Sequence, residues 1–448
     1  MNTRQYRRQD RQSLWHPYSR HSAIASQPFP VITSGAGVYL TDTDGHRYLD
    51  AISSWWACNL GHSHPRLVKA IQRQAAELQH SILGNMSHPR AIELAAEITA
   101  LFGAESRRVF FAGDGASAVE AALKIAVQYW HNTGHPERCR IVSLDHAYHG
   151  DTLGAVSVGY QAGFHQAFRP LMFPVLRAEA PFCAGCRRQL TPDTCHLECF
   201  ASMEAILTQQ ADTVAAVIIE PLCQGAAGMR LYAPAYLAKL AELCRRYDIL
   251  LIADEIAVGF GRTGKMFACE HAGIQPDIVC LGKGLSGGYL PISATVVKPE
   301  IFETFRDQSG DHTFYHGHTF AGNPIAAAVA LEMLTVYREA DIVSKAEQMG
   351  HILGREMERF KQLPGVKRVR GLGMIAALDL EDEQGQPSVI RAQAVRERLL
   401  AWGVLIRPLG AVVYLMPPLI IGEDVLIKLV DDVYRAIQEV IGGQRAGL

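Results

Sequence analysis

The sequence lacks a large net charge of either sign, and it lacks any long hydrophobic run. Its 43 Lys and Arg residues nearly balance 45 Asp and Glu residues, which leaves a formal net charge of −2 at pH 7. This balance gives no indication of binding to nucleic acid or to an anionic membrane. The first residues, MNTRQYRRQDRQ, are basic but lead into no apolar run. We therefore expect a mobile N-terminal tail, no signal peptide, no membrane span and a cytoplasmic protein.

Cysteine is not scarce, but the export signal that would favour a disulfide framework is missing. Six of the ten cysteines have apolar neighbours and are expected to be buried: Cys58, Cys139, Cys223, Cys244, Cys269 and Cys280. The other four, in the insertion-like segment 181–200, follow a C-x2-C-x8-C-x3-C pattern: Cys183, Cys186, Cys195 and Cys199. That pattern is typical of a four-thiolate zinc or iron–sulfur site, and a reduced cluster or a redox-sensitive pair is the alternative.

The middle of the chain alternates short apolar runs with helical patterns. VAAVII, ILLIA and IVCL each have the length of a strand that is buried on both faces, and PAYLAKLAELCRR between the first two has helical periodicity. This alternation predicts an α/β protein with a mainly parallel sheet. At 448 residues with 48% hydrophobic content, the chain can form a large α/β domain with a smaller domain appended.

Two of these apolar runs end on chemically capable side chains. Asp254 follows ILLIA and Lys283 follows IVCL, within Gly282-Lys283-Gly284. Ligands bind beyond the carboxyl ends of strands in open α/β sheets. Lys283 could form a Schiff base there, with Asp254 holding a pyridinium nitrogen protonated, as pyridoxal phosphate (PLP) requires. A structural or phosphate-loop lysine is the alternative, although the upstream glycine and following Ser or Thr of a phosphate loop are absent.

Other segments contribute candidate binding residues. Gly115 and Ala116 lie at a tight turn entering a helix, where free N–H groups favour a phosphate, although many such turns bind nothing. Tyr148 follows another strand and can stack on a planar ring. Thr319 either caps the helix that begins near Asn323-Pro324 or donates to a phosphate.

Near the two ends of the chain, aromatic and basic residues suggest a substrate site. Tyr18 lies in an irregular segment and either lines a site or packs. Trp55 and Trp56 are adjacent, so one of them is expected to face a cleft. Arg407 ends the run Val404-Leu405-Ile406 and either binds a carboxylate or forms a surface ion pair.

Taken together, these motifs resemble the class III (fold type I) PLP-dependent aminotransferases over nearly the whole chain. The matching residues are Gly115-Ala116, Tyr148-His149-Gly150, Glu220-Pro221, Asp254-Glu255-Ile256, the run Gly259 to Gly264, Lys283-Gly284 and Gly317-His318-Thr319. The resemblance implies a large PLP-binding domain at 61–335 with a mainly parallel central sheet. It also implies a small α/β domain built from residues 1–60 and 336–448.

For the cofactor, the resemblance implies a defined set of contacts. Lys283 would bind PLP covalently and move a proton, while Asp254 would pair with the ring nitrogen. Ile256 and Tyr148 would pack on the two faces of the ring. Four further residues would reach the phosphate, the last two from the second subunit of a homodimer: Gly115, Ala116, His318 and Thr319.

For the substrate, the resemblance extends to members that make 7,8-diaminononanoate in biotin synthesis, through HPYS, SSWWA and IRPLGAVVYLMPP. It implies transfer of an amino group to 8-amino-7-oxononanoate, with S-adenosylmethionine as donor and lysine as the alternative. Another ω-aminotransferase activity is the rival. Arg407 would bind the carboxylate, Tyr18 would tune the donor step, and Trp55, Tyr148 and Gly317 would line the channel. Arg262 either lies near substrate or is structural.

Overall fold

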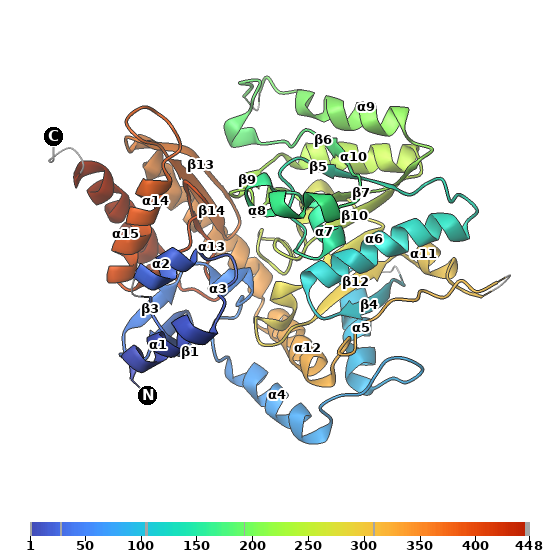
Figure 1. The fold of residues 1–448 in the computed structure, drawn as a ribbon, viewed down its shortest axis with the longest axis horizontal. Helices are drawn as coiled ribbons and strands as arrows, with labels where there is room; N and C mark the ends of the chain where they lie inside the picture. The colour runs from blue at the N-terminus through green and yellow to red at the C-terminus, as the bar shows by residue number, and fades with distance from the viewer. Residues whose placement is uncertain (1, 27–28, 104–105, 192, 308–309, 444–448) are drawn as a thin grey trace.

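The computed structural model describes residues 2–26, 29–103, 106–191, 193–307 and 310–443. Its centre is a seven-stranded sheet in the order β4-β12-β11-β10-β7-β5-β6 (Figure 1). The strands are Arg108–Ala112 (β4), Arg140–Leu144 (β5), Leu176–Ala178 (β6), Val214–Ile219 (β7), Leu250–Asp254 (β10), Ile278–Leu281 (β11) and Ser293–Val297 (β12). Only β12 runs antiparallel to its neighbours, so the expected mainly parallel sheet is confirmed.

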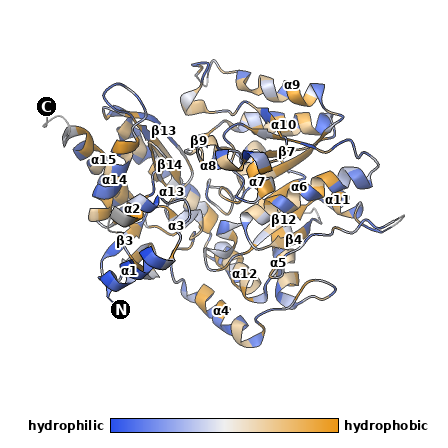
Figure 2. Ribbon diagram, viewed as in Figure 1, coloured by the Kyte–Doolittle hydropathy of each residue, from blue (hydrophilic) through white to orange (hydrophobic). Residues whose placement is uncertain are grey.

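Helices cover both faces of this sheet, which explains why its central strands are apolar throughout. On β7, Ala216 and Ile218 pack with α6 (Gly115–Asn132), whereas Val217 and Ile219 pack with α10 (Pro234–Arg246). Successive side chains of a strand point to opposite faces, so the two helices lie on opposite sides. Figure 2 shows the hydrophobic colour concentrated on central strands such as β7 and β12.

The remaining strands form smaller sheets. The first contains β1 (Ile32–Ala36), β2 (Tyr39–Asp42), β3 (Arg47–Asp50) and β15 (Val404–Leu405); the second contains β13 (Val366–Leu372), β14 (Ile375–Leu380) and β16 (Val412–Leu415); β8 (Cys223–Gln224) and β9 (Arg230–Leu231) form a hairpin. Because β15 pairs in parallel with β3, the N-terminal segment and the C-terminal part of the chain share one sheet.

The other helices surround these sheets. They are α1 (Thr3–Ser13), α2 (His21–Ser26), α3 (Ser53–Trp56), α4 (Pro65–Glu77), α5 (Pro89–Ala100), α7 (Leu153–Val158), α8 (Ala162–His165), α9 (Ala201–Gln209), α11 (Pro299–Glu303), α12 (Pro324–Glu339), α13 (Ile342–Met357), α14 (Val389–Ala401) and α15 (Glu423–Gly443). Among the described residues, no helix is both long and apolar enough to cross a membrane. The boundary expected at 335/336 falls inside α12, and the next break between helices is at 340–341; the division into domains stays a prediction.

Two expectations were wrong. The N-terminal tail forms α1, because Asn2 and Gln5 make a capping box and the Thr3 hydroxyl lies 2.7 Å from that of Thr43. Cys139 is exposed, because it lies in the loop before β5 rather than in a strand, while the other five scattered cysteines are buried.

Candidate active site

A cavity of about 450 Å³ lies at the carboxyl ends of β10 and β7. It brings together residues that are far apart in the sequence. Six residues expected to contact a cofactor border it: Gly115, Ala116, Tyr148, Asp254, Ile256 and Lys283. Because the strands run in parallel, their carboxyl ends meet at one edge of the sheet, which is where a ligand binds in such folds.

Asp254 is held in one orientation at the end of β10. Its Oδ2 lies 2.7 Å from Nδ1 of His149, and its Oδ1 accepts the Ile256 N–H at 3.1 Å. Both side chains of the Asp254–His149 pair are buried. A buried carboxylate is costly unless its oxygens are hydrogen-bonded, so the contacts with His149 and the Ile256 N–H stabilise it.

Lys283 follows β11 with a strained backbone (φ 39°), and its partly buried side chain borders the cavity. Burial lowers the pKa of its amine, while the carboxylates of Asp254 and Glu220 oppose that shift. Its Nζ lies 4.8 Å from the ring centroid of Trp56 and has no hydrogen-bonding partner among the described residues. A buried amine with a lowered pKa is more readily neutral, which is the form that attacks a carbonyl group.

The first turn of α6 borders the opposite part of the cavity. Asp114 caps this helix through the Ser117 N–H at 2.9 Å. In the described part of the chain, the N–H groups of Gly115 and Ala116 meet no acceptor. A side chain at Gly115 would come within 2.9 Å of Ile256, so the helix end and Ile256 need glycine to approach this closely. Free N–H groups at a helix N-terminus bind an anion such as phosphate.

A hydrogen-bonded group of side chains forms the mouth of the cavity. Asp151 accepts the hydroxyl of Tyr148 at 3.0 Å and also the hydroxyl of Tyr18. Burial, with the hydrogen bond to Asp151, raises the pKa of Tyr18 to about 12. Burial likewise raises the pKa of Tyr148, and its hydrogen bond to Tyr18 adds to the effect. Both phenols are therefore protonated donors near neutral pH.

Trp55 and Arg407 lie beside this group. The Arg407 guanidinium stands 4.2 Å from the Trp55 ring centroid, and the Tyr18 ring meets Trp55 edge-on at 5.9 Å. Within the described ranges Arg407 forms no ion pair, so its two-pronged donor set is available to a carboxylate. Trp56, rather than Trp55, borders the inner cavity.

Arg262 is buried in a structural role, the second of the two interpretations. It donates to the Pro417 carbonyl at 2.7 Å and to the Asn59 side-chain oxygen at 2.8 Å. Gly317, His318 and Thr319 are exposed and lie outside the cavity of their own chain. The N-cap of α12 is Asn323, so Thr319 does not cap that helix.

The residues present fit PLP as a bound group. The unpartnered N–H groups of Gly115 and Ala116 suit its phosphate, and the buried amine of Lys283 suits its aldehyde. The buried carboxylate of Asp254 suits a protonated ring nitrogen. All three functions face one cavity large enough for a small planar ligand.

This fold and this site are those of a transaminase, and the chain belongs to the class III aminotransferases, which are PLP-dependent: the model of that family, aminotransferase class-III, matches residues 21–437. A curated relative from Synechococcus elongatus, an adenosylmethionine-8-amino-7-oxononanoate aminotransferase, is 43% identical over 96% of this chain and 98% of its own. The crystal structure of the enzyme of that name from Methanocaldococcus jannaschii superposes with a TM-score of 0.91, at 36% identity over 98% of this chain and 99% of its own. An ω-transaminase from Pseudomonas jessenii, solved in complex with PMP, gives a TM-score of 0.90 at 32% identity, over 97% and 98% of the two chains.

Three further residues that border the cavity had no role predicted from the sequence: His149, Asp151 and Glu220. Trp56 is the member of the tryptophan pair that faces it. His149 and Glu220 stand in motifs that carried the resemblance, so their position after a strand was an available signal. Asp151 stands three residues after Tyr148, and only the folded loop shows that it joins Tyr148 to Tyr18.

The four clustered cysteines lie outside this cavity. Cys183 begins a short 3₁₀ turn that packs against β9 and β13, and Cys186, Cys195 and Cys199 are partly buried. No three of their sulfur atoms lie within 4.8 Å of one another in the described structure. A tetrahedral thiolate site needs closer sulfur atoms, and a metal there stays a prediction.

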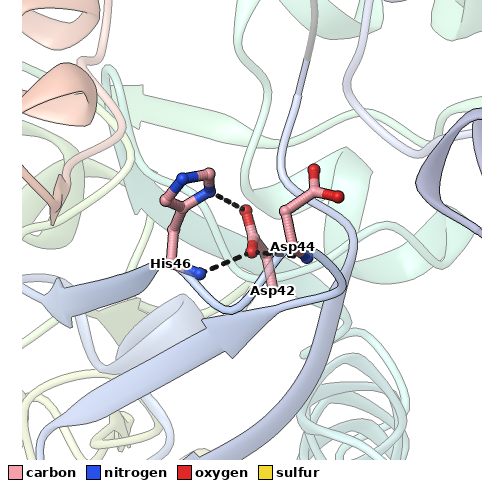
Figure 3. Close-up of side chains that lie close together, drawn as sticks. All are labelled: Asp42, Asp44 and His46. Atoms are coloured by element: carbon pink, nitrogen blue, oxygen red, sulfur yellow. Dashed lines mark hydrogen bonds and ion pairs between the residues drawn. The ribbon is translucent and has the colours of Figure 1, made fainter.

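The described residues do bring Asp42, Asp44 and His46 together at the turn between β2 and β3 (Figure 3). The Asp42 oxygens already accept the N–H groups of Asp44 and His46 and the Tyr48 hydroxyl, at 2.8–2.9 Å. These bonds close the turn, so the group has a structural explanation.

Proposed function

We propose that this chain transfers an amino group to 8-amino-7-oxononanoate, giving 7,8-diaminononanoate in biotin synthesis, with S-adenosylmethionine as the amino donor. The observation that carries the proposal is that the Lys283 amine and the Asp254 carboxylate enter one cavity from adjacent strand ends. The shared name of the Synechococcus and Methanocaldococcus relatives supports the substrate.

PLP supplies an aldehyde that binds amines and a ring that accepts the electrons of a broken C–H bond. Lys283 would hold the cofactor through that aldehyde, and its Nζ would be the group that moves a proton between carbon atoms. Asp254, oriented by His149, keeps a proton on the ring nitrogen. Ile256 and Tyr148 hold the ring plane, and the α6 N-terminus holds the phosphate.

Substrate recognition is assigned to the mouth. Arg407, which lies over Trp55, binds the carboxylate of the oxononanoate through paired N–H donors. Tyr18 and Asp151 contact the amino donor as it enters. Their hydrogen bond joins the N-terminal segment to the Tyr148 loop at the mouth of the cavity. Trp55 and Tyr148 line the passage to Lys283, and Gly317 joins them from a second copy of the chain.

The active site is completed by a second copy of the chain. Gly317, His318 and Thr319 are exposed on their own chain and outside its cavity, although the family motif assigns His318 and Thr319 to the phosphate. A homodimer that places this segment over the partner's α6 reconciles both facts. The exposed aromatic side chains on either side of this segment, Tyr315 and Phe320, suit burial in such an interface.

Two alternatives remain open to experiment. Lysine is the alternative donor, because HGHT at 316–319 places His318 where another residue is more familiar. Another ω-aminotransferase activity is the rival acceptor chemistry. The test supplies purified enzyme with 8-amino-7-oxononanoate and either S-adenosylmethionine or lysine, and follows diaminononanoate by mass spectrometry. Product with S-adenosylmethionine alone supports the proposal. Product with lysine alone reassigns the donor, and no product with either refutes the acceptor.

A further inference from the structure

Glu220 is a buried carboxyl group that forms no ion pair with any residue the structure describes. It follows β7 and borders the cavity together with Lys283 and Asp254. Its Oε1 accepts the Tyr148 N–H at 3.0 Å and its Oε2 accepts the Gly225 N–H at 2.9 Å. In the described structure no Lys, Arg or His forms an ion pair with it. Asp254, by contrast, is paired with His149 at 2.7 Å.

These two hydrogen bonds link three walls of the site. Tyr148 belongs to the loop after β5, and Gly225 belongs to the β8–β9 hairpin. Gly225 packs directly on Trp56, because a Cβ at Gly225 would lie 3.2 Å from that ring. Trp56 in turn lies under Nζ of Lys283 at 4.8 Å. Glu220 therefore holds the Tyr148 loop and the Trp56 wall at fixed positions around the amine.

The ionisable groups that face this space come from five segments of the chain. They are Asp114 before α6; Tyr148, His149 and Asp151 after β5; Glu220 after β7; Asp254 on β10; and Lys283 after β11. Burial raises the pKa of Glu220 to about 7, whereas His149 and the two N–H donors favour its charged form. The charges of Asp254 and Glu220 both act to raise the pKa of the Lys283 amine. Both carboxylates therefore act on Nζ, Asp254 more strongly; Asp254 is also bonded to His149, whereas Glu220 is held only by backbone N–H groups.

We propose that Glu220 is a positioning residue of the transamination reaction, whose carboxyl group shares the cavity with Lys283 and fixes the Tyr148 loop against the Trp56 wall. The inference rests on the proposed function, because it concerns the same lysine. A cation on Nζ and a carboxylate beside it stabilise each other, so each favours the charged form of the other. Glu220 would thereby stabilise a proton held on Nζ of Lys283.

The chain offers a matched control in Glu255. This residue is also fully buried, its two oxygens accept the N–H groups of Ala268 and Cys269 at 2.9 and 2.8 Å, and burial raises its pKa to about 7. It does not border the cavity. Glu220→Gln and Glu255→Gln therefore remove equivalent buried carboxyl groups, of which only one faces Lys283.

The experiment measures the visible absorbance of the cofactor-loaded enzyme against pH, together with the pH profile of kcat, for wild type and both variants. Removing a negative charge destabilises a proton on Nζ of Lys283. Glu220→Gln should therefore move the midpoint of the absorbance titration about one pH unit lower, the scale of one nearby buried charge. Glu255→Gln should leave the midpoint unchanged. A midpoint in Glu220→Gln equal to that of wild type, or an equal shift in both variants, would overturn the inference.

A further variant covers the case in which Glu220→Gln fails to fold, as judged by circular dichroism. Glu220→Asp keeps the charge but shortens the reach to Tyr148 and Gly225, so it should lower kcat several-fold while keeping the wild-type midpoint. An Asp variant whose midpoint falls by a full unit contradicts the inference. Wild-type enzyme that takes up no PLP at Lys283 refutes the proposed function, and the inference with it; normal uptake with identical midpoints refutes the inference alone.

Discussion

The interior of the cavity and its mouth are built in different ways. The interior residues Asp254, Glu220 and Lys283 lie at the carboxyl ends of neighbouring strands of one sheet. The two carboxylates each take part in two hydrogen bonds. At the mouth, Tyr18 and Trp55 are each about 40% exposed and come from the N-terminal segment, while Arg407 comes from the C-terminal part. The residues assigned to the reaction are therefore positioned by a single sheet. Those assigned to substrate selection come from segments at both ends of the chain.

The largest effect is expected inside, at Asp254. Asp254→Asn keeps the shape but removes the charge that holds a proton on the ring nitrogen, so kcat should fall about 100–1000-fold, the range for loss of one preorganised electrostatic group. Asp277→Asn is the control. The Asp277 carboxylate accepts the N–H of Leu251, a residue of the strand that carries Asp254, at 2.8 Å, but Asp277 lies outside the cavity. Steady-state kinetics would contradict the account if the two variants lost activity equally.

At the mouth, Arg407→Ala should act on binding rather than on chemistry. Loss of a paired, charge-assisted contact to the carboxylate should raise KM for the oxononanoate about 10–100-fold. Arg407→Lys should recover only part of this, because an ammonium cannot make the two parallel bonds. The KM of the amino donor serves as the internal measure: a rise as large as that for the acceptor would show that Arg407 does not select the carboxylate.

A smaller effect is expected for Tyr18. Tyr18→Phe removes the hydroxyl that binds Asp151 and should slow the donor half-reaction about 10-fold, the contribution of roughly one hydrogen bond to a charged group, with the acceptor half-reaction unchanged. Tyr48→Phe is the control: the Tyr48 hydroxyl donates to Asp42 at 2.8 Å and its pKa is likewise raised to about 12, but it lies away from the cavity. Single-turnover rates for each half-reaction make the comparison. Equal slowing of the donor and acceptor half-reactions would show that Tyr18 has a structural role instead.

The smallest effect is expected outside both regions, at the clustered cysteines. Replacing Cys183, Cys186, Cys195 and Cys199 by serine should leave kcat within about twofold of wild type, because none borders the cavity. Elemental analysis of the wild-type protein decides separately whether a metal is bound. A tenfold loss of kcat in the serine variant would show that this segment supports the active site.

The same contrast explains what the sequence could predict. Asp254 and Lys283 were predictable because an apolar strand followed by a polar residue fixes where that residue lies in a parallel sheet. The Asp151 bridge between Tyr18 and Tyr148 was not, because hydrogen bonds between segments 133 residues apart leave no local pattern. Nor could periodicity decide which tryptophan borders the cavity, since the kink in α3 at Ser54 and Trp55 sets their directions.

The most direct test concerns Lys283 itself. The purified protein is incubated with PLP, reduced with borohydride, digested and analysed by mass spectrometry, with Lys239→Ala as a surface-lysine control. The account predicts one phosphopyridoxyl group per chain on the peptide that contains Lys283, unchanged in the control and absent from Lys283→Ala. A protein that remains unlabelled, or that carries the group on another lysine, would contradict the assignment of this cavity as the PLP site.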